Sequence, residues 1–227
     1  MNVITMASRK GGTGKSTLTA HLAAFAHRAG HRCTVIDADP QGSLTLWHSL
    51  RTDGQPPLRC ATRGIERELA QAMVDGSEWV FVDTAASMWV VAQEAIRWAT
   101  LVVIPARPGF FDLNAVRETV AIARQRCKPY AVVLNATPPK RGDKEAPAVA
   151  QSRAYFDKLA IPVWSGQIGQ RAGYVVTLTN GASVNEATPL SVAAIEIAGL
   201  WLALERSVRA INAARTAPPR APHGQAA

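Results

Sequence analysis

The glycine-rich stretch from Arg9 to Thr17, which reads Arg-Lys-Gly-Gly-Thr-Gly-Lys-Ser-Thr, constrains the fold more than any other part of the chain. It lies between an apolar run over residues 3–7 and an alanine-rich helical pattern that begins near Ser16. Three glycines within four positions let the backbone curl tightly, so that successive N–H groups can point inward at phosphate oxygens. We therefore interpret the stretch as a phosphate-binding loop between a strand and a helix.

Two polar side chains at the end of the loop support this interpretation. Lys15 can reach the β- and γ-phosphates of a nucleotide as a point charge, and the Ser16 hydroxyl is the expected magnesium ligand. A glycine turn without a ligand would explain neither residue. The residues of this loop that we expect to bind the nucleotide are Gly11, Gly12, Thr13, Gly14, Lys15, Ser16 and Thr17.

The loop departs from the common pattern G-x-x-x-x-G-K-[ST], because Arg9 stands where the first glycine would be and Lys10 follows it. Residues 10–16 resemble instead the deviant Walker A loop, K-G-G-x-G-K-[ST], of the ParA/MinD family of ATPases, and most closely that of short ParA-type partition ATPases. The resemblance implies that ATP and Mg2+ are bound and that ATP is hydrolysed, with Lys15 among the catalytic residues. It also implies that Lys10 crosses a dimer interface to the phosphates of the partner's nucleotide. A solvated surface lysine is the alternative for Lys10.

A pair of acids follows the apolar run over residues 33–36, in the segment Asp37-Ala38-Asp39-Pro40-Gln41. Carboxylates at the carboxyl end of a parallel strand lie where ligands bind in open α/β sheets. The segment resembles the family's D-x-D-P-Q, which implies that Asp39 orients the attacking water as a catalytic residue and that Asp37 supports the magnesium. The alternative for Asp37 is that it caps the helix that carries Trp47.

Two further apolar runs end in polar residues. Residues 79–82 precede Asp83, and four apolar residues followed by an acid form the Walker B pattern, in which the acid holds a magnesium-bound water. The segment Asp83-Thr84-Ala85-Ala86 replaces the usual D-x-P-P of the family, which leaves the rigidity and partner response of this switch segment open. Asn135 ends the run over residues 131–134, as the adenine-contacting Asn does in similar ATPases; a turn-forming Asn before Pro138 is the alternative.

The order of apolar and helical segments predicts the fold class. Apolar runs at residues 3–7, 33–36, 79–82, 101–105, 131–134 and 161–164 are separated by helical patterns, and a short strand is expected at 58–61. This alternation predicts an α/β fold, a doubly wound and mainly parallel sheet with helices on both faces, as in P-loop NTPases. We expect one ATPase domain over residues 1–205, then a basic helix end and a disordered tail over residues 206–227.

The chain is basic, with 25 Lys and Arg against 17 Asp and Glu and a formal net charge of +8, which points to a polyanion as a partner. Arg171 resembles the family's segment in which an arginine helps to bind DNA. The acid-free C-terminal end carries the other candidates, Arg206, Arg209, Arg215 and Arg220. A terminus that only aids solubility is the alternative for that end.

Other functions are excluded by what the sequence lacks. No run of eighteen uncharged apolar residues is present, so we expect neither a signal peptide nor a membrane span. The three cysteines are scattered and form no C-x-x-C pair, which argues against a disulfide framework or a zinc site. These features predict a cytoplasmic protein with no membrane partner.

The function that we expect is that of a ParA-like ATPase, which forms a homodimer on ATP, binds DNA without sequence preference and is released by hydrolysis. Such a protein drives the partition or positioning of plasmid or chromosomal DNA, and an adaptor protein bound to the centromere stimulates its ATPase. We expect it to associate with the nucleoid when ATP is bound. Because no helix-turn-helix segment precedes Val3, operator recognition is not expected.

Alternatives stay open at the level of sequence. A dethiobiotin-synthetase-like ligase has a related fold and phosphate loop, but it would need neither Lys10 nor a basic C-terminal end. Within the family, conjugative DNA transfer and the positioning of protein clusters are further roles, and the sequence does not name the cargo. A MinD-like membrane role is disfavoured, because the end of the chain lacks the Leu/Phe-rich face that an interfacial helix needs.

Overall fold

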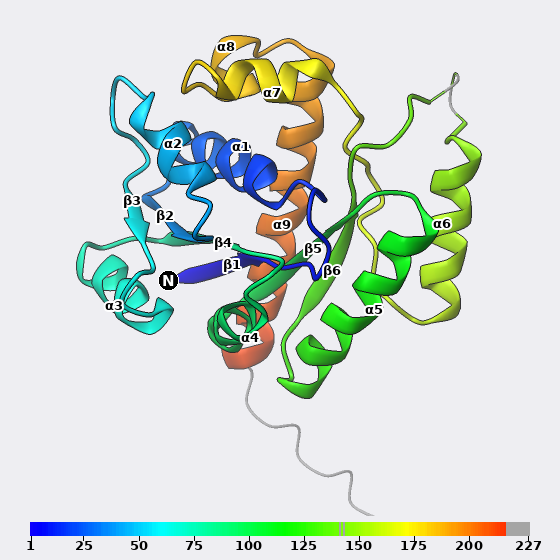
Figure 1. The fold of residues 1–227 in the computed structure, drawn as a ribbon, viewed down its shortest axis with the longest axis horizontal. Coiled ribbons are helices and arrows are strands. Elements are labelled where there is room, and N and C mark those ends of the chain that lie inside the picture. Colours follow the sequence, from blue (N-terminus) through cyan, green and yellow to red (C-terminus); the bar gives the residue numbers. More distant parts are fainter. Residues whose placement is uncertain (141, 143, 217–227) are drawn as a thin grey trace, which may run out of the picture.

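The computed structural model describes residues 1–140, 142 and 144–216, and a parallel β-sheet forms its centre (Figure 1). The strands are β1 (Asn2–Met6), β2 (Cys33–Ala38), β3 (Leu58–Cys60), β4 (Trp79–Thr84), β5 (Leu101–Ala106) and β6 (Tyr130–Leu134). Their order is β3-β2-β4-β1-β5-β6, and all the described neighbours pair in parallel. The chain winds from β1 toward β3 and later from β4 toward β6, which confirms the predicted doubly wound α/β fold.

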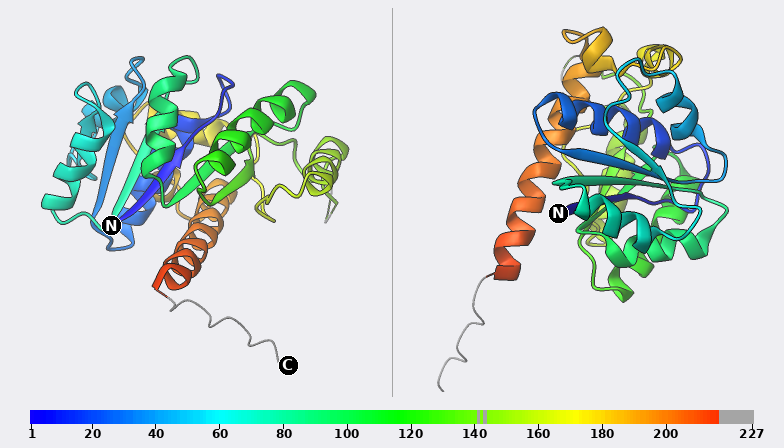
Figure 2. Two further views of the ribbon diagram at one scale, coloured as in Figure 1. Left: turned by 90° about the horizontal axis from the view of Figure 1, so that it is seen from below. Right: turned by 90° about the vertical axis from the view of Figure 1, so that its left-hand side faces the viewer.

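Helices cover both faces of the sheet (Figures 1 and 2). α1 (Lys15–Arg28) and α9 (Val192–Thr216) pack together on one face, and α2 (Ser43–Ser49), α7 (Ala172–Leu178) and α8 (Val184–Ala187) contact α1. The other face carries α3 (Ile65–Val74), α4 (Trp89–Trp98) and α5 (Phe110–Gln125), with α6 (Pro147–Lys158) packed against the same core as α5. Within the part of the chain described, no helix combines the length and apolar character that a membrane span needs.

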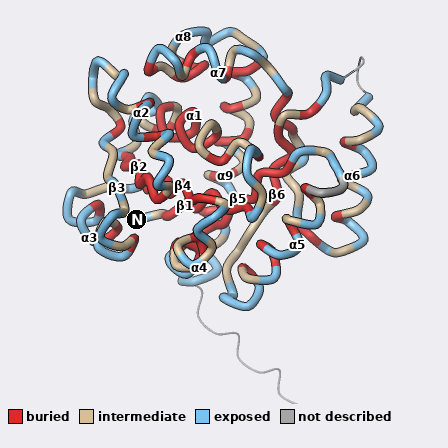
Figure 3. The backbone as a smooth tube through the Cα atoms, viewed as in Figure 1, coloured by how far each residue is buried: buried red, intermediate tan, exposed pale blue. Residues whose placement is uncertain are grey.

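The core is built by the alternation of side chains along the strands. In β4 the side chains of Val80 and Val82 pack with α3 and α4, whereas Phe81 packs with α1 and α9. Every residue of β4 is buried, as expected for a central strand that is covered on both faces, and Figure 3 shows the buried strands at the centre of the molecule. Trp201 of α9 packs on the face of the sheet that α1 covers, with its ring centroid 4.7 Å from that of Trp79. These layers hold the carboxyl ends of the strands at one edge.

The predicted strand over residues 161–164 is wrong. Among the described residues, a single parallel bridge joins Val163 to Val132 in this segment, and the Trp164 N–H donates to the Val132 carbonyl at 2.9 Å. Pro162 has no N–H to donate, so it cannot continue a ladder of hydrogen bonds. The sheet still has six strands, because β3 forms in the segment expected at 58–61. It pairs with β2, at the edge of the sheet opposite β6.

The C-terminal helix α9 stays packed on the core beyond residue 205. α9 reaches Thr216, Val208 is buried, and Asn212 donates from its side chain to that of Asn2 at 2.9 Å. The helix thus continues across residue 205, in agreement with the expected basic helix end, and the domain boundary stays a prediction. Arg206, Arg209 and Arg215 are exposed on α9, whereas Arg220 and the expected tail from residue 217 onward lie outside the described residues.

A buried histidine fastens α1 to the helices beside it. The His21 Nε2–H donates to the Tyr174 carbonyl at 3.1 Å, and the Val184 N–H donates to Nδ1 at 3.2 Å. Because one ring nitrogen donates and the other accepts, the imidazole is neutral in this arrangement. Burial lowers the pKa of His21 to about 4, against the opposing effects of the Tyr174 hydrogen bond and the Glu186 charge. Protonation would disrupt the contact between α1, α7 and α8.

We predict that acid destabilises the fold through His21. Its pKa is about 4 in the folded chain and about 6.5 when unfolded, so the unfolded state takes up the proton first. This contribution to stability is complete above about pH 6.5 and is lost as the pH falls toward 4, a loss of about 3 kcal/mol. Urea unfolding at a series of pH values should show a smaller acid loss in His21→Gln than in wild type. His27→Gln, on the same helix, is the control, and equal pH dependence in wild type and His21→Gln would contradict the prediction.

Candidate nucleotide-binding site

The predicted phosphate loop connects β1 to α1 at the carboxyl edge of the sheet. Gly12 and Gly14 have φ angles of +71° and +94°, a region that side chains rarely adopt. A Cβ on Gly14 would also collide with the side chain of Asn135. Gly14 precedes the first residue of α1, so the loop delivers the chain to a helix N-terminus, whose free N–H groups favour anions.

Asn135, which follows β6, holds this loop from behind. Its Nδ2 donates to the Thr13 carbonyl at 2.6 Å, and only 8% of the residue is exposed. Sequence reasoning weighed an adenine contact against a turn for Asn135 and did not foresee a contact with the loop backbone. The adenine contact stays a prediction.

The two lysines of the loop point to different partners. The Lys15 side chain is largely buried and its ammonium donates to the Lys10 carbonyl at 3.3 Å. Burial lowers the pKa of Lys15, and the charges of Asp83 and Asp39 oppose this shift. The Lys10 ammonium lies 3.7 Å from the carboxylate of Asp112, which is on α5. The Lys15 side chain is therefore held within the loop, whereas the Lys10 side chain extends to the first turn of α5.

Asp83 is a buried acid without a partner. Both of its carboxylate oxygens are buried and accept no hydrogen bond in the described structure. Burial raises the pKa of Asp83 to about 7, the charges of Asp37 and Asp39 raise it further, and the nearby Ser16 hydroxyl and Lys15 ammonium oppose the rise. An orphaned carboxylate is costly unless a cation or proton accompanies it.

The surroundings of Asp83 fit a magnesium ion. Ser16 and Asp83 offer the hard oxygen ligands that Mg2+ prefers. Among the described residues, no group of three or more His, Cys, Asp and Glu side chains could hold a metal alone. A magnesium ion here would take its remaining ligands from water and phosphate, as Mg2+ sites in nucleotide-binding proteins commonly do.

The two acids after β2 differ in their surroundings. Asp37 is buried, and its Oδ2 accepts the N–H and the hydroxyl of Thr45, at 2.9 and 2.8 Å, in the first turn of α2. Its Oδ1 accepts the Asp39 N–H at 3.2 Å. These contacts favour the capping interpretation of Asp37 over a metal ligand. Asp39 is half-buried and accepts the Gln41 N–H at 2.9 Å, so its carboxylate keeps acceptor capacity.

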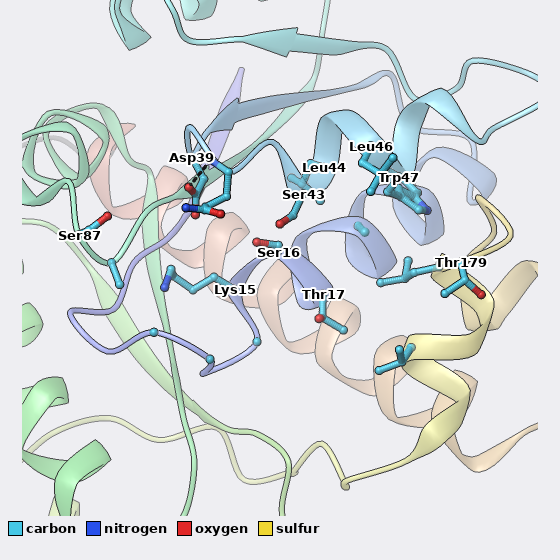
Figure 4. A pocket seen from close by; sticks show the side chains of 18 of the residues that line it. Lys15, Ser16, Thr17, Asp39, Ser43, Leu44, Leu46, Trp47, Ser87 and Thr179 are labelled. Atoms are coloured by element: carbon cyan, nitrogen blue, oxygen red, sulfur yellow. Dashed lines mark hydrogen bonds between the residues drawn. The ribbon is translucent and has the colours of Figure 1, made fainter.

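A cavity of about 900 Å3 opens over the loop and has two unlike ends (Figure 4). Lys15, Asp39 and Ser87 lie toward one end, and Leu46, Trp47 and Thr179 lie toward the other. The polar end follows strands β2, β4 and β1, whereas α2 and α7 form the apolar end. The size suits a nucleotide, and the polar end is where its charged phosphates would be stabilised.

The apolar end is braced by a nearly buried arginine. The Arg51 side chain is 3% exposed and pairs with Glu186 at 2.7 Å, while it donates to the Gly181 carbonyl at 2.9 Å. Its guanidinium also lies over the Trp47 ring, 4.9 Å from the centroid. These contacts hold the segment after α2 against α8 and the loop before it.

The switch segment after Asp83 is tied to the loop by Arg9. The Arg9 guanidinium lies 4.9 Å from the centroid of the Trp89 ring, at the start of α4, and pairs with Glu118 of α5 at 3.0 Å. The Thr84 hydroxyl donates to the Met6 carbonyl at 2.8 Å. The segment that lacks the family's prolines is thus anchored at both ends by side chains.

Two residues at the polar end escaped sequence reasoning, Arg107 and Asp112. Arg107 lines the cavity directly after β5, and Asp112 lies in the first turn of α5, beside Lys10. Ligands bind at the carboxyl ends of parallel strands, the rule that pointed to the acids after β2. Applied to β5 as well, it would have found Arg107.

The predicted DNA contact Arg171 is engaged within the chain. Its Nη2 donates to Glu196 of α9 at 2.7 Å, and the Tyr174 hydroxyl and the Gly169 N–H bind the same carboxylate. Arg209 pairs with Glu205 at 2.8 Å on the surface of α9. A phosphate contact through Arg171 would have to share or replace the pair with Glu196, and its DNA role stays a prediction.

Comparison with known proteins agrees with this arrangement. A family model described as "CobQ/CobB/MinD/ParA nucleotide binding domain" matches residues 4–184. The protein ParA of Rhizobium radiobacter is 35% identical over 118 residues, which cover 49% of this chain and 51% of the relative. The chromosome-partitioning ATPase Soj of Thermus thermophilus is 30% identical over 148 residues, 52% of this chain and 59% of the relative. The match thus spans about half the length of these relatives.

A solved structure shows the same fold over a longer span. Apo McdA of Cyanothece superposes with a TM-score of 0.73 at 17% sequence identity, covering 90% of this chain and 99% of that one. At this identity the likeness concerns the fold alone. The family match extends from β1 through the phosphate loop to the start of α8. The chain therefore belongs to the CobQ/CobB/MinD/ParA family of nucleotide-binding domains, with ParA and Soj among its relatives.

Proposed function

We propose that this protein is a Mg2+-dependent, ParA-like ATPase, which forms a homodimer on ATP, binds DNA without sequence preference and positions a cargo. The observation that carries the proposal is the phosphate loop, on which Lys15 and Ser16 lie beside the buried and unpartnered Asp83 carboxylate. Two other proteins of this fold, McdA of Cyanothece and MinD of Pyrococcus horikoshii, were solved with ATP and with Mg-ADP. The first supports ATP as the ligand, and the second supports a nucleotide bound with magnesium.

Each site residue has a role that its surroundings support. The loop N–H groups and Lys15 bind the phosphates, and Thr17 and the start of α1 extend that contact. Ser16 and Asp83 would hold Mg2+, which when bound supplies Lewis-acid stabilisation of phosphate charge. Asp39, at the polar end, orients the attacking water, since phosphoryl transfer depends chiefly on positioning.

The cargo belongs to the same proposal. ParA and Soj carry names that refer to partition, and the protein of Gloeobacter kilaueensis named "Maintenance of carboxysome distribution protein A" is 33% identical over 129 residues. Both DNA and a protein assembly are therefore candidate cargoes, each recognised through an adaptor that stimulates the ATPase. Three exposed arginines on α9, Arg206, Arg209 and Arg215, support DNA as the surface on which the dimer moves.

Asp39→Asn should bind ATP yet lose hydrolysis. The amide keeps an acceptor for the Gln41 N–H but cannot orient and polarise water as a carboxylate does, so turnover should fall by about 10²–10⁴. Calorimetry should give an ATP affinity within about threefold of wild type, because the ground-state contacts remain. Asp157→Asn, an exposed acid on α6, is the matched control. Normal turnover in Asp39→Asn would place the water-orienting role elsewhere, with Asp37 the next candidate.

Lys10→Ala should separate ATP binding from assembly. The proposal places the Lys10 ammonium on the partner's phosphates in the dimer, so its present contact with Asp112 must be replaced when two subunits meet. Monomers should still bind ATP, and light scattering should show no ATP-dependent dimer. Lys158→Ala, on α6, should dimerise as wild type does. An ATP-dependent dimer of Lys10→Ala would remove the dimer part of the proposal.

Binding to a random-sequence duplex should require ATP and fall steeply with salt. Each phosphate contact contributes about −0.9 to the slope of log affinity against log salt, because counterions are released. Arg206→Gln should lower the magnitude of the slope by about that amount for each subunit in contact, and Arg67→Gln on α3 should leave it unchanged. The titration is made with ATP and with ADP. Equal affinity in both states, or no binding at low salt, would refute the DNA-carrier function and favour an ATP-dependent ligase.

A further inference from the structure

An arginine outside the recognised motifs faces the nucleotide cavity. Arg107 directly follows β5 and lines the cavity together with Lys15, Asp39 and Ser87. Its guanidinium forms no ion pair and no hydrogen bond with any residue that the structure describes; the one recorded bond is made by its backbone. An arginine without a counter-ion beside a phosphate-binding loop is suited to an oxyanion, because its planar fork of N–H groups matches phosphate oxygens.

The backbone of Arg107 is held by the same acid that contacts Lys10. The Arg107 N–H donates to Asp112 Oδ1 at 3.3 Å, and Asp112 Oδ2 lies 3.7 Å from the Lys10 ammonium. Asp112 is 7% exposed, whereas Arg107 is exposed and 39% of the Lys10 side chain is exposed, so a buried acid holds two groups that solvent and ligands can reach. This acid sets Arg107 beside the first residues of the phosphate loop, at the polar end of the cavity.

The position at the polar end decides which part of a nucleotide Arg107 would meet. In Figure 4 Lys15, Asp39 and Ser87 lie toward one end of the cavity, away from the Leu46 and Trp47 side chains of α2. Asp39 is the residue that we expect beside the attacking water, and water attacks the terminal phosphate. Arg107 shares this end, whereas none of the described residues that line the apolar end is charged. Arg51, which lies over Trp47, is paired with Glu186.

We propose that Arg107 binds the terminal phosphate of the nucleotide in its own subunit, and that Asp112 positions it. This inference rests on the proposed function and adds a cation that neither the phosphate loop nor a partner's Lys10 supplies. The terminal phosphate is the group that distinguishes ATP from ADP. Arg107 therefore contributes to the preference for ATP and little to the affinity for ADP.

Arg107→Gln tests the contact directly. With Mg2+ present, calorimetric titrations should show ATP affinity lowered about tenfold, the size of one charge-assisted hydrogen bond, and ADP affinity within about twofold of wild type. Arg107→Lys should restore part of the ATP affinity, because it keeps the charge but not the fork. Arg117→Gln, exposed on α5 and outside the cavity, is the control. Unchanged ATP affinity in Arg107→Gln, or equal losses for ATP and ADP, would overturn the inference.

Two variants of Asp112 test the positioning. Asp112→Asn keeps an acceptor for the Arg107 N–H, whereas Asp112→Ala removes it, and both remove the charge beside Lys10. The alanine variant should lose the preference for ATP over ADP as Arg107→Gln does, and the asparagine variant should keep it. Equal loss in both variants would show that Asp112 acts through its charge and would overturn the positioning role. Thermal unfolding checks that each variant is folded.

The failures of the two proposals can be told apart. A wild-type protein that binds neither ATP nor ADP would sink the proposed function. Wild-type binding of ATP together with indifferent Arg107 variants would sink only the inference about Arg107.

Discussion

The hydrogen bond from Asn135 to the Thr13 carbonyl is the contact on which the geometry of the site depends. It holds the loop against the end of β6, and it requires a glycine at position 14, because any Cβ there would meet the Asn135 side chain. A loop fixed from behind keeps its N–H groups aimed at the cavity before a ligand arrives. Binding then costs less ordering entropy than it would for a mobile loop.

The charged side chains near the polar end of the cavity differ in how far neighbouring groups stabilise them. Asp37 accepts two hydrogen bonds from Thr45, and the Lys10 ammonium lies 3.7 Å from the carboxylate of Asp112, although the charge of Asp37 still acts on Asp83. Asp83 remains without a partner, and burial raises its pKa to about 7 because water cannot reach it. A metal cation beside the phosphates of a nucleotide would lower the cost of burying this acid.

The sequence predicted the sheet, the phosphate loop and the strand-end acids, because each is fixed by local pattern. Glycines at 11, 12 and 14 and acids after apolar runs need no knowledge of distant residues. What it missed depends on packing between segments far apart in the chain. The Asn135 contact spans 122 residues, and the pairing of Arg171 with Glu196 joins two helices that no periodicity connects. The segment 161–164 was predicted as a strand from its apolar residues, but Pro162 has no N–H for a ladder of hydrogen bonds, and a single bridge to Val132 forms instead.

The helix α7 links the cavity to the far helix α9. It lines the apolar end through Val175 and Leu178, while His21 fastens it to α1, the helix that begins at Lys15. From its other side, Arg171 and the Tyr174 hydroxyl bind Glu196 on α9, which also carries the exposed Arg206, Arg209 and Arg215. A ligand shifts an equilibrium only by contacts that differ between two states. A nucleotide that displaced α7 would therefore act on the pair that holds Arg171 and on the helix that carries the other arginines.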